Sequence, residues 1–169
     1  MSIDFSDKVS VLGFTLGMEY KDVILKLEAL GSPYSKDMGQ ISGDITFKIQ
    51  NPIQDLGILK YYLQFELAKG EKITTLMLCS YAKSESESKQ AYDELSMVAF
   101  DALKYKKSQI VDVPNASVDE ERIFYMTENY FLMKRRMKVF PYLVFLSFSD
   151  INELCERMYL WISTIFGSC

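Results

Sequence analysis

Apolar residues near the N-terminus recur at the spacing of an amphipathic helix. Between Gly17 and Leu30 they fall three or four residues apart, which places them on one face of a helix. Gly31 and Pro33 follow directly, and both residue types commonly mark the end of a helix. The pattern predicts one amphipathic helix over this stretch.

Two further helices are predicted by capping boxes, in which a side chain at the start of a helix and a glutamate three residues later satisfy free backbone N–H groups. Ser84 stands in this relation to Glu87, and Asp150 to Glu153. We expect these helices to begin within about three residues of Ser84 and Asp150. The apolar stripe of the last helix consists of Ile151, Leu154, Cys155, Met158, Ile162 and Ile165.

Alternation of apolar and polar residues predicts the strands. It is clearest over residues 59–67, where Leu63 and Phe65 are flanked by the more polar Tyr62, Gln64 and Glu66. Similar patterns between turn residues predict further strands. Their ranges are 45–49, 73–81, 122–127, 130–139 and 143–148.

The order of these elements predicts an α+β fold. A helix is followed by three strands, a second helix, three more strands and a third helix. We expect antiparallel sheets with all helices on one sheet face, which leaves the other face solvated or free to bind. The chain is predicted to be a single domain over 1–169, or two fused lobes of about 1–82 and 83–169.

The region around the first helix carries a family resemblance. The stretch from Leu12 to Met18 reads Leu-Gly-Phe-Thr-Leu-Gly-Met and leads into the helix that closes on Gly31 and Pro33. It resembles the start of domains related to β-lactamase inhibitor protein and to the small outer-membrane lipoproteins of barrel assembly, and also a group of uncharacterised Bacteroides-type proteins. In those families a short strand leads through Gly-Met into a helix, and the inhibitor repeats a helix-plus-sheet lobe twice. The resemblance implies the same tandem fold here.

The chain contains no histidine, which restricts the chemistry open to it. Histidine is the side chain best suited to move protons near neutral pH, and it is the commonest metal ligand. Its absence excludes Ser-His-Asp triads, Cys-His pairs and mixed Cys/His zinc sites. We predict a protein that is not an enzyme, with no catalytic residue, no metal site and no cofactor.

Charge and cysteine content limit the partners and the compartment. The net charge of -4 opposes the broad basic surface of a nucleic-acid-binding protein, so we predict no nucleic-acid partner. Cys79, Cys155 and Cys169 are odd in number and show no CxxC spacing, which predicts three free thiols. No run approaches the roughly 20 apolar residues of a membrane span. We expect a soluble cytoplasmic protein, or an extracytoplasmic one if a signal peptide has been removed.

A cluster of cations stands out in this acidic chain, at Lys134, Arg135, Arg136 and Lys138. It has three interpretations: charges that protect an edge strand from aggregation, a patch that binds an acidic protein, and, least favoured because no Gly-rich loop accompanies it, a site for phosphate or nucleic acid. Alternation would put Lys134, Arg136 and Lys138 on an open face together with Tyr130, and Tyr62 is expected on the same face. The opposite set, predicted as core, then contains an unexplained arginine, and it consists of Phe131, Met133, Arg135, Met137 and Val139.

The leading hypothesis is therefore a non-enzymatic protein-binding module, of the inhibitor or immunity type, that uses an open sheet face. Two alternatives remain: a secretion-chaperone-like escort protein that forms a homodimer, and a histidine-independent hydrolase that uses carboxylates or a thiol. The oligomeric state is left open. The candidate residues for binding an acidic protein partner are Tyr62, Tyr130, Lys134, Arg136 and Lys138.

Overall fold

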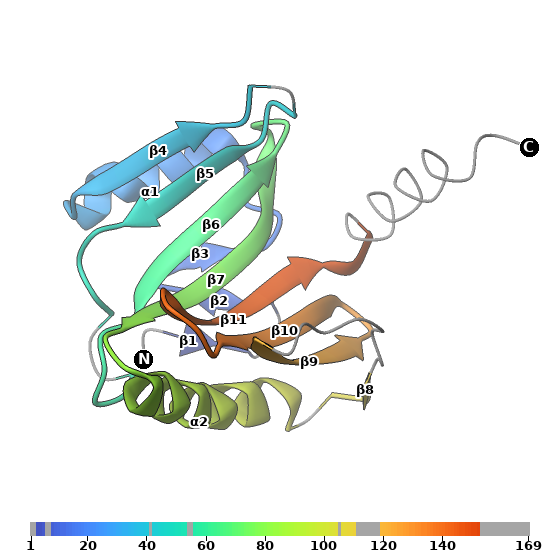
Figure 1. Ribbon diagram of the computed structural model, residues 1–169. Helices are drawn as coiled ribbons and strands as arrows, with labels where there is room; N and C mark the ends of the chain where they lie inside the picture. The colour runs from blue at the N-terminus through green and yellow to red at the C-terminus, as the bar shows by residue number, and fades with distance from the viewer. Residues whose placement is uncertain are drawn as a thin grey trace, which may run out of the picture.

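An eight-stranded antiparallel sheet dominates the structure, a computed structural model that describes residues 3–5, 8–40, 42–53, 56–104, 106–110 and 119–152 (Figure 1). The strand order is β4-β5-β6-β7-β11-β10-β9-β8. Its strands are β4 (Tyr34–Met38), β5 (Ile45–Ile49), β6 (Tyr62–Ala68), β7 (Lys72–Ala82), β8 (Ser108–Ile110), β9 (Glu120–Thr127), β10 (Tyr130–Met137) and β11 (Tyr142–Asp150).

The remaining elements are two helices and a small second sheet. The helices are α1 (Tyr20–Leu30) and α2 (Glu85–Leu103). The second sheet consists of the two-residue strands β1 (Ile3–Asp4), β2 (Ser10–Val11) and β3 (Phe14–Thr15). No helix within the described ranges is long and apolar enough to cross a membrane.

Both helices pack on the same face of the large sheet, which we call the inner face. Tyr20 of α1 lies with its ring 6.4 Å from that of Phe47 in β5. At the start of β6, the Tyr61 hydroxyl donates to the Ala91 carbonyl of α2. The alternation of β6 puts Tyr61 and Phe65 on one face, and Phe65 stacks on Phe47 at 5.3 Å. In Figure 1, α1 accordingly runs along β4 and β5, and α2 runs along β9 and β10.

The core lies between the inner face and the elements that cover it. Phe14 of the small sheet stacks on Phe65 with ring centroids 4.7 Å apart, so this sheet caps the centre of the large one. Farther along the sheet, Leu95 of α2 is fully buried and the helix contacts β7, β10 and β11. The apolar halves of the alternating strands thus supply one continuous core.

The helix predictions hold wherever the structure describes the residues. Helix α1 ends at Gly31, whose φ of 62° requires the left-handed conformation that glycine adopts readily. The Ser84 hydroxyl caps α2 by accepting a hydrogen bond from the Glu87 N–H at 3.2 Å. At the third predicted helix, a carboxylate oxygen of Asp150 accepts from the Asn152 N–H at 2.9 Å. The rest of that helix, Glu153 included, lies outside the described residues.

The α+β class and the antiparallel sheets are confirmed, but the predicted order of elements is wrong. The six predicted strands are present as β5, β6, β7, β9, β10 and β11. The structure adds β4 and β8, whose residues are all exposed and therefore show no alternation in burial. It also places the small strands β1 to β3 before α1, and each is too short for a periodic pattern.

The large sheet joins strands from the two predicted lobes. β7 ends at Ala82, where the first lobe of about 1–82 was expected to end, and it pairs with β11 of the second. Leu78 lies opposite Leu146 in this pairing, and both side chains are fully buried. The number of independently folding domains remains a prediction.

Candidate functional site

The structure separates the residues that were predicted to share an open face. Tyr130, Lys134 and Arg136 point from β10 toward α2, and their exposed fractions are 2%, 7% and 7%. Tyr62 lies on the other side of the sheet, because it is offset by one residue from the inward-facing Tyr61 and Leu63. Lys138 follows the end of β10. The predicted open face is therefore wrong.

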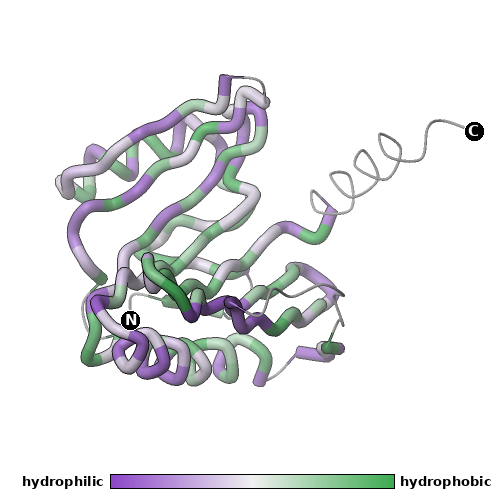
Figure 2. Tube along the Cα trace, in the orientation of Figure 1, coloured by the Kyte–Doolittle hydropathy of each residue, from purple (hydrophilic) through white to green (hydrophobic). Residues whose placement is uncertain are grey.

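The inward-facing cations of β10 find partners beneath α2. Lys134 Nζ lies 3.8 Å from the centroid of the Tyr92 ring and donates to the Ser96 hydroxyl. Burial lowers the pKa of Lys134. Arg136 pairs with Glu121, with 3.0 Å between Nη2 and Oε2. Figure 2 shows this hydrophilic run of β10 above α2, where the sequence pattern alone suggested solvent.

The outer face of β10 is the apolar one. Phe131 and Met133 point outward, and the Phe131 ring lies 5.3 Å from that of Phe124 in β9. Arg135, unexplained in the predicted core, also points outward and pairs with Glu120. The predicted alternation was therefore correct and the assignment of its two faces was inverted. The cationic face is the inner one because polar groups on α2 and β9 pair with its side chains. The sequence of β10 alone does not show which elements will pack against each of its faces.

The contact between Lys134 and Ser96 resembles a catalytic serine-lysine pair. A hydrolase of that type also needs N–H donors aimed at the developing oxyanion. Ser96 lies in the interior of α2, where backbone N–H groups are bonded to carbonyls four residues earlier. Its own hydroxyl donates to the Tyr92 carbonyl at 2.8 Å. The pair is consistent with helix-sheet packing and gives no support to the hydrolase hypothesis.

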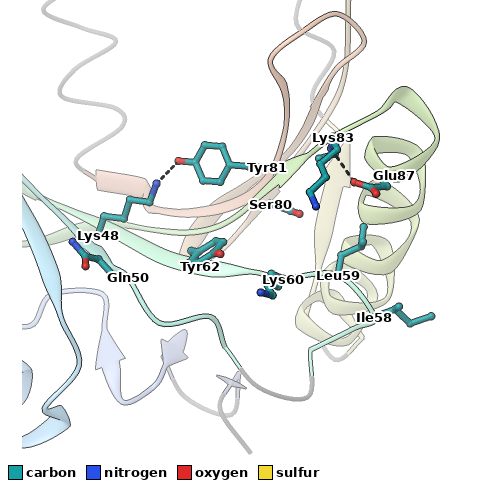
Figure 3. Close-up of a pocket in the computed structure, with 11 residues that line it drawn as sticks. Lys48, Gln50, Ile58, Leu59, Lys60, Tyr62, Ser80, Tyr81, Lys83 and Glu87 are labelled. Atoms are coloured by element: carbon teal, nitrogen blue, oxygen red, sulfur yellow. Dashed lines mark hydrogen bonds between the residues drawn. The ribbon is translucent and has the colours of Figure 1, made fainter.

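A hollow of about 670 Å³ opens on the outer side of the sheet, where β6 and β7 separate (Figure 3). β6 pairs with β7 only as far as Tyr62 opposite Cys79, whereas β7 continues to Ala82 with β11 on its other side. The chain before β6 diverges here and leaves the space. The lining residues are Lys48, Gln50, Ile58, Leu59, Lys60, Tyr62, Ser80, Tyr81, Ala82, Lys83 and Glu87.

Positive charge predominates around this hollow, which we call the basic pocket. Lys48, Lys60 and Lys83 line it together with a single carboxylate, that of Glu87. Glu87 accepts a hydrogen bond from the Lys83 backbone N–H at 2.8 Å, so its carboxylate is held at the start of α2. The whole chain has a net charge of -4, so the basic pocket is a local reversal of sign that can attract an anionic group.

Two tyrosines provide the aromatic wall of the basic pocket. The Tyr62 and Tyr81 rings are 6.2 Å apart and inclined at 60°. Lys48 Nζ donates to the Tyr81 hydroxyl at 2.8 Å and lies 4.1 Å from the centroid of its ring (Figure 3). Tyr81 is 49% exposed, so its ring is available for contact. Rings with polar tips suit a surface that contacts another protein.

Cys79 lies beside this wall without the properties of a nucleophile. It is 2% exposed, and burial raises the pKa of its thiol to about 12, although Lys48 acts in the opposite direction. The thiolate is the reactive form of cysteine, so this thiol is protonated and inert at neutral pH. Cys155 and Cys169, the other predicted free thiols, lie outside the described residues.

Of the residues in the basic pocket, only Tyr62 was predicted as a binding residue. The alternation of their strands did indicate that Lys48 and Lys60 face outward. It could not indicate that β5, β6 and β7 are neighbours in a register that brings these lysines to Tyr81 and Lys83. That information depends on long-range strand pairing, which a local pattern does not contain.

Comparison with protein-family models, characterised proteins and solved structures gave no match. The resemblance to inhibitor-type and lipoprotein domains therefore remains a prediction. Within the described residues, no group of three or more acidic or cysteine side chains has the geometry to hold a metal ion.

Proposed function

We propose that this protein is a non-enzymatic protein-binding module whose basic pocket holds an acidic segment of a protein partner. The observation that carries the proposal is the meeting of Lys48, Lys60 and Lys83 with two tyrosines in one hollow of an acidic chain. Such a module would act as an antagonist, of the inhibitor or immunity type, by occupying a functional segment of its target. The sequence also led to the hypothesis of a protein-binding module, but the binding surface proposed here is the basic pocket instead of the cationic face of β10.

The partner segment is proposed to be acidic because lysines surround the basic pocket, and extended because, in the described part of the chain, one side of the end of β7 has no neighbouring strand. Within the described residues, Ser80 to Ala82 have no partner strand on the side of the basic pocket. Backbone N–H and C=O groups on the free side of a strand can pair with an extended peptide, whose side chains then give specificity. The lysines around this edge would select a peptide with glutamate or aspartate.

Nucleic acid is a less suitable ligand for the same pocket. A nucleic-acid-binding surface usually spreads over many phosphates and gives the domain a basic balance. Here the hollow is lined by only three lysines, and the overall charge is -4. An escort protein that forms a homodimer is the second candidate. The exposed edge strand β4, with all five residues exposed, favours it because such an edge can pair with a second copy.

The test is a binding titration with a defined probe. A fluorescein-labelled peptide of alternating glutamate and valine is acidic and favours an extended conformation, and the lysine-valine peptide is its matched control. We expect anisotropy to report binding of the acidic peptide only, with the affinity lowered roughly tenfold or more by Lys60→Glu combined with Lys83→Glu. Single-stranded DNA should compete poorly.

A charge-reversal control separates the pocket from the overall charge of the protein. Lys72 is exposed at the opposite end of β7, so Lys72→Glu changes the net charge without touching the basic pocket. This variant should bind like the wild type. Equal losses in the Lys72 and Lys60/Lys83 variants, or preferential binding of DNA, would contradict the proposal. Light scattering on the same samples would favour the escort hypothesis if it found a stable dimer.

A further inference from the structure

Exposed apolar side chains gather at the end of the sheet where the basic pocket opens. Ile58 is 86% exposed and Phe140 is 82% exposed, and no other large apolar side chain in the described part of the chain is as exposed. Ile58 lines the basic pocket. Phe140 lies in the turn between β10 and β11, and this turn is beside the pocket because Tyr142 is paired with Ala82, which lines it. We call Ile58 and Phe140 the apolar rim.

The two side chains of the apolar rim come from opposite sides of β7. Ile58 belongs to the chain before β6, whereas Phe140 precedes β11. The strand order β6-β7-β11 therefore puts the free edge of Ser80 to Ala82 between them. Because neighbouring strands are about 4.8 Å apart, a peptide paired with that edge would lie roughly 10 Å from the start of β11. Side chains from the end of such a peptide and from Phe140 can together cover this separation.

Local contacts hold both side chains of the apolar rim in their exposed positions. The Ile58 backbone N–H donates to Glu94 Oε1 of α2 at 3.4 Å. The Phe140 ring lies 6.3 Å from the Tyr142 ring in an edge-on arrangement, with an interplanar angle of 84°. An apolar side chain that is already held in place loses less conformational entropy on binding than a mobile one. The apolar rim is therefore suited to act as a pair of anchors.

We propose that the segment held by the basic pocket is bipartite, with an acidic stretch and, at one end of it, large apolar side chains that cover the apolar rim. This inference rests on the proposed function and adds the apolar half of the partner. Single exposed apolar residues are ordinary on a protein surface, but these two are continuous with a pocket lined by lysines and tyrosines. Aromatic and aliphatic anchors that become buried on binding supply much of the energy of a protein interface.

A membrane surface is the other class of partner that combines anionic groups with an apolar interior. Attachment of that type uses an exposed basic face, commonly with four or more lysines or arginines. Here three lysines among the described residues line a hollow, and the net charge of -4 opposes approach to an anionic bilayer. A protein segment can place carboxylates inside the hollow and apolar side chains on the rim, so it is the better fit.

Two labelled peptides test the apolar half of the partner. One is the glutamate-valine peptide extended by Leu-Trp-Leu, and the other is extended by Ser-Gly-Ser, with each extension placed at either terminus in turn. We expect the apolar extension, at one of the two ends, to lower the Kd roughly tenfold. Phe140→Ser should remove most of this gain, so that both peptides bind the variant about equally. Phe100→Ser is the matched control and should keep the gain, because Phe100 is 60% exposed and lies roughly 20 Å along α2 from Glu87.

The outcomes separate this inference from the proposed function. If neither peptide binds, both fail. If the Ser-Gly-Ser peptide binds but the apolar extension adds nothing at either end, the pocket holds an acidic segment without an apolar half. The inference fails in the same way if the gain persists in Phe140→Ser or is lost equally in Phe100→Ser. Sedimentation with phosphatidylserine-phosphatidylcholine vesicles should show no binding, and binding that Phe140→Ser abolished would assign the apolar rim to a membrane. If Phe140→Ser failed to fold by circular dichroism, Ile58→Ser would replace it and should also reduce the gain.

Discussion

Lys134 lies 3.8 Å from the centre of the Tyr92 ring, on the face of β10 that α2 covers. The ammonium group donates to Ser96 of the same helix, so a cation that the sequence placed in solvent joins the sheet to α2. Attraction between the cation and the ring offsets part of the cost of burying the charge. This contact explains why the cationic side of β10 faces inward.

The burial of Lys134 should make stability depend on pH in a defined direction. Burial lowers the pKa of Lys134 below the ordinary 10.5, and Asp93 and Glu121 oppose that change. The unfolded chain therefore holds this proton more tightly, so the contribution of Lys134 to stability rises as the pH increases from the lowered pKa toward 10.5. Lys134→Met should remove that rise and change the free energy of unfolding at pH 7 by only about 1 kcal/mol. Urea denaturation between pH 7 and pH 10.5 measures this.

The control for that series is Lys72→Met, since Lys72 is exposed on β7. Its pH dependence should follow that of the wild type. If Lys134→Met also kept the wild-type pH dependence, the ammonium group would not be buried as described.

Reversing the charge of Arg136 should destabilise the fold. Arg136 is 7% exposed and pairs with Glu121, so Arg136→Glu would set two carboxylates against each other beneath α2. We expect a loss of about 2–4 kcal/mol in the free energy of unfolding. Lys138→Glu, beyond the end of β10, should cost less than about 0.5 kcal/mol. Equal and small effects in both variants would instead favour the exposed basic face predicted from the sequence.

Tyr61 should contribute to stability at neutral pH through Glu94, and less so in acid. Burial acts to raise the pKa of Glu94, but hydrogen bonds from the Tyr61 hydroxyl, from Gln90 and from the Ile58 and Leu59 backbone outweigh it and lower this pKa. A carboxylate with a lowered pKa stabilises the fold above its unfolded pKa of about 4.5, and this contribution is lost as the pH falls through the folded value.

Tyr61→Phe removes the hydroxyl that lies 2.6 Å from Glu94 Oε2. We expect a loss of about 1–2 kcal/mol at pH 7, and a smaller loss at pH 3, where protonation of Glu94 weakens the wild-type contact. Guanidinium denaturation at the two pH values measures the difference. A loss that is the same at both would mean that the hydroxyl acts only through the Ala91 carbonyl.

The thiol of Cys79 should be unreactive in the native protein. Burial raises its pKa to about 12, so almost no thiolate exists at pH 8. Titration with Ellman's reagent should label Cys79 only after unfolding, and the unfolded, unreduced chain should give three thiols. Rapid modification of Cys79, identified by peptide mapping of the native protein, would contradict the burial. A count of one thiol in the unfolded chain would indicate a disulfide.

Local signals in the sequence were sufficient to predict most of the long helices and strands. The capping box at Ser84 marks a helix start because its hydrogen bonds form within one turn. Strand β4 was missed because each of its residues is exposed, which removes the alternation in hydrophobicity that identifies a strand. The small strands Ile3–Asp4 and Ser10–Val11 are stabilised by pairing and by packing, neither of which appears in a two-residue pattern.

The site was less predictable than the fold, because it depends on which strands are neighbours. Tyr62 was correctly expected to face outward, and its partners Tyr81 and Lys48 come from the strands on either side. For Lys134 the sequence pattern separated the two faces of β10 correctly, but it placed this lysine on the open face, and the structure places it on the covered one. The choice was made by Ser96 and Tyr92, which lie about 40 residues away along the chain.

The central claim is that the basic pocket binds an acidic segment, and stopped-flow kinetics with the labelled glutamate-valine peptide test it most directly. Lys83→Glu should slow association and flatten its dependence on salt, because Lys83 would steer the peptide at long range. Tyr81→Ala should mainly speed dissociation, because it removes a contact made only in the complex. We therefore expect Lys83→Glu to change mainly the association rate, Tyr81→Ala to change mainly the dissociation rate, and Lys72→Glu to show wild-type kinetics. If Lys83→Glu and Lys72→Glu slowed association equally and Tyr81→Ala left dissociation unchanged, the basic pocket would not be the binding site.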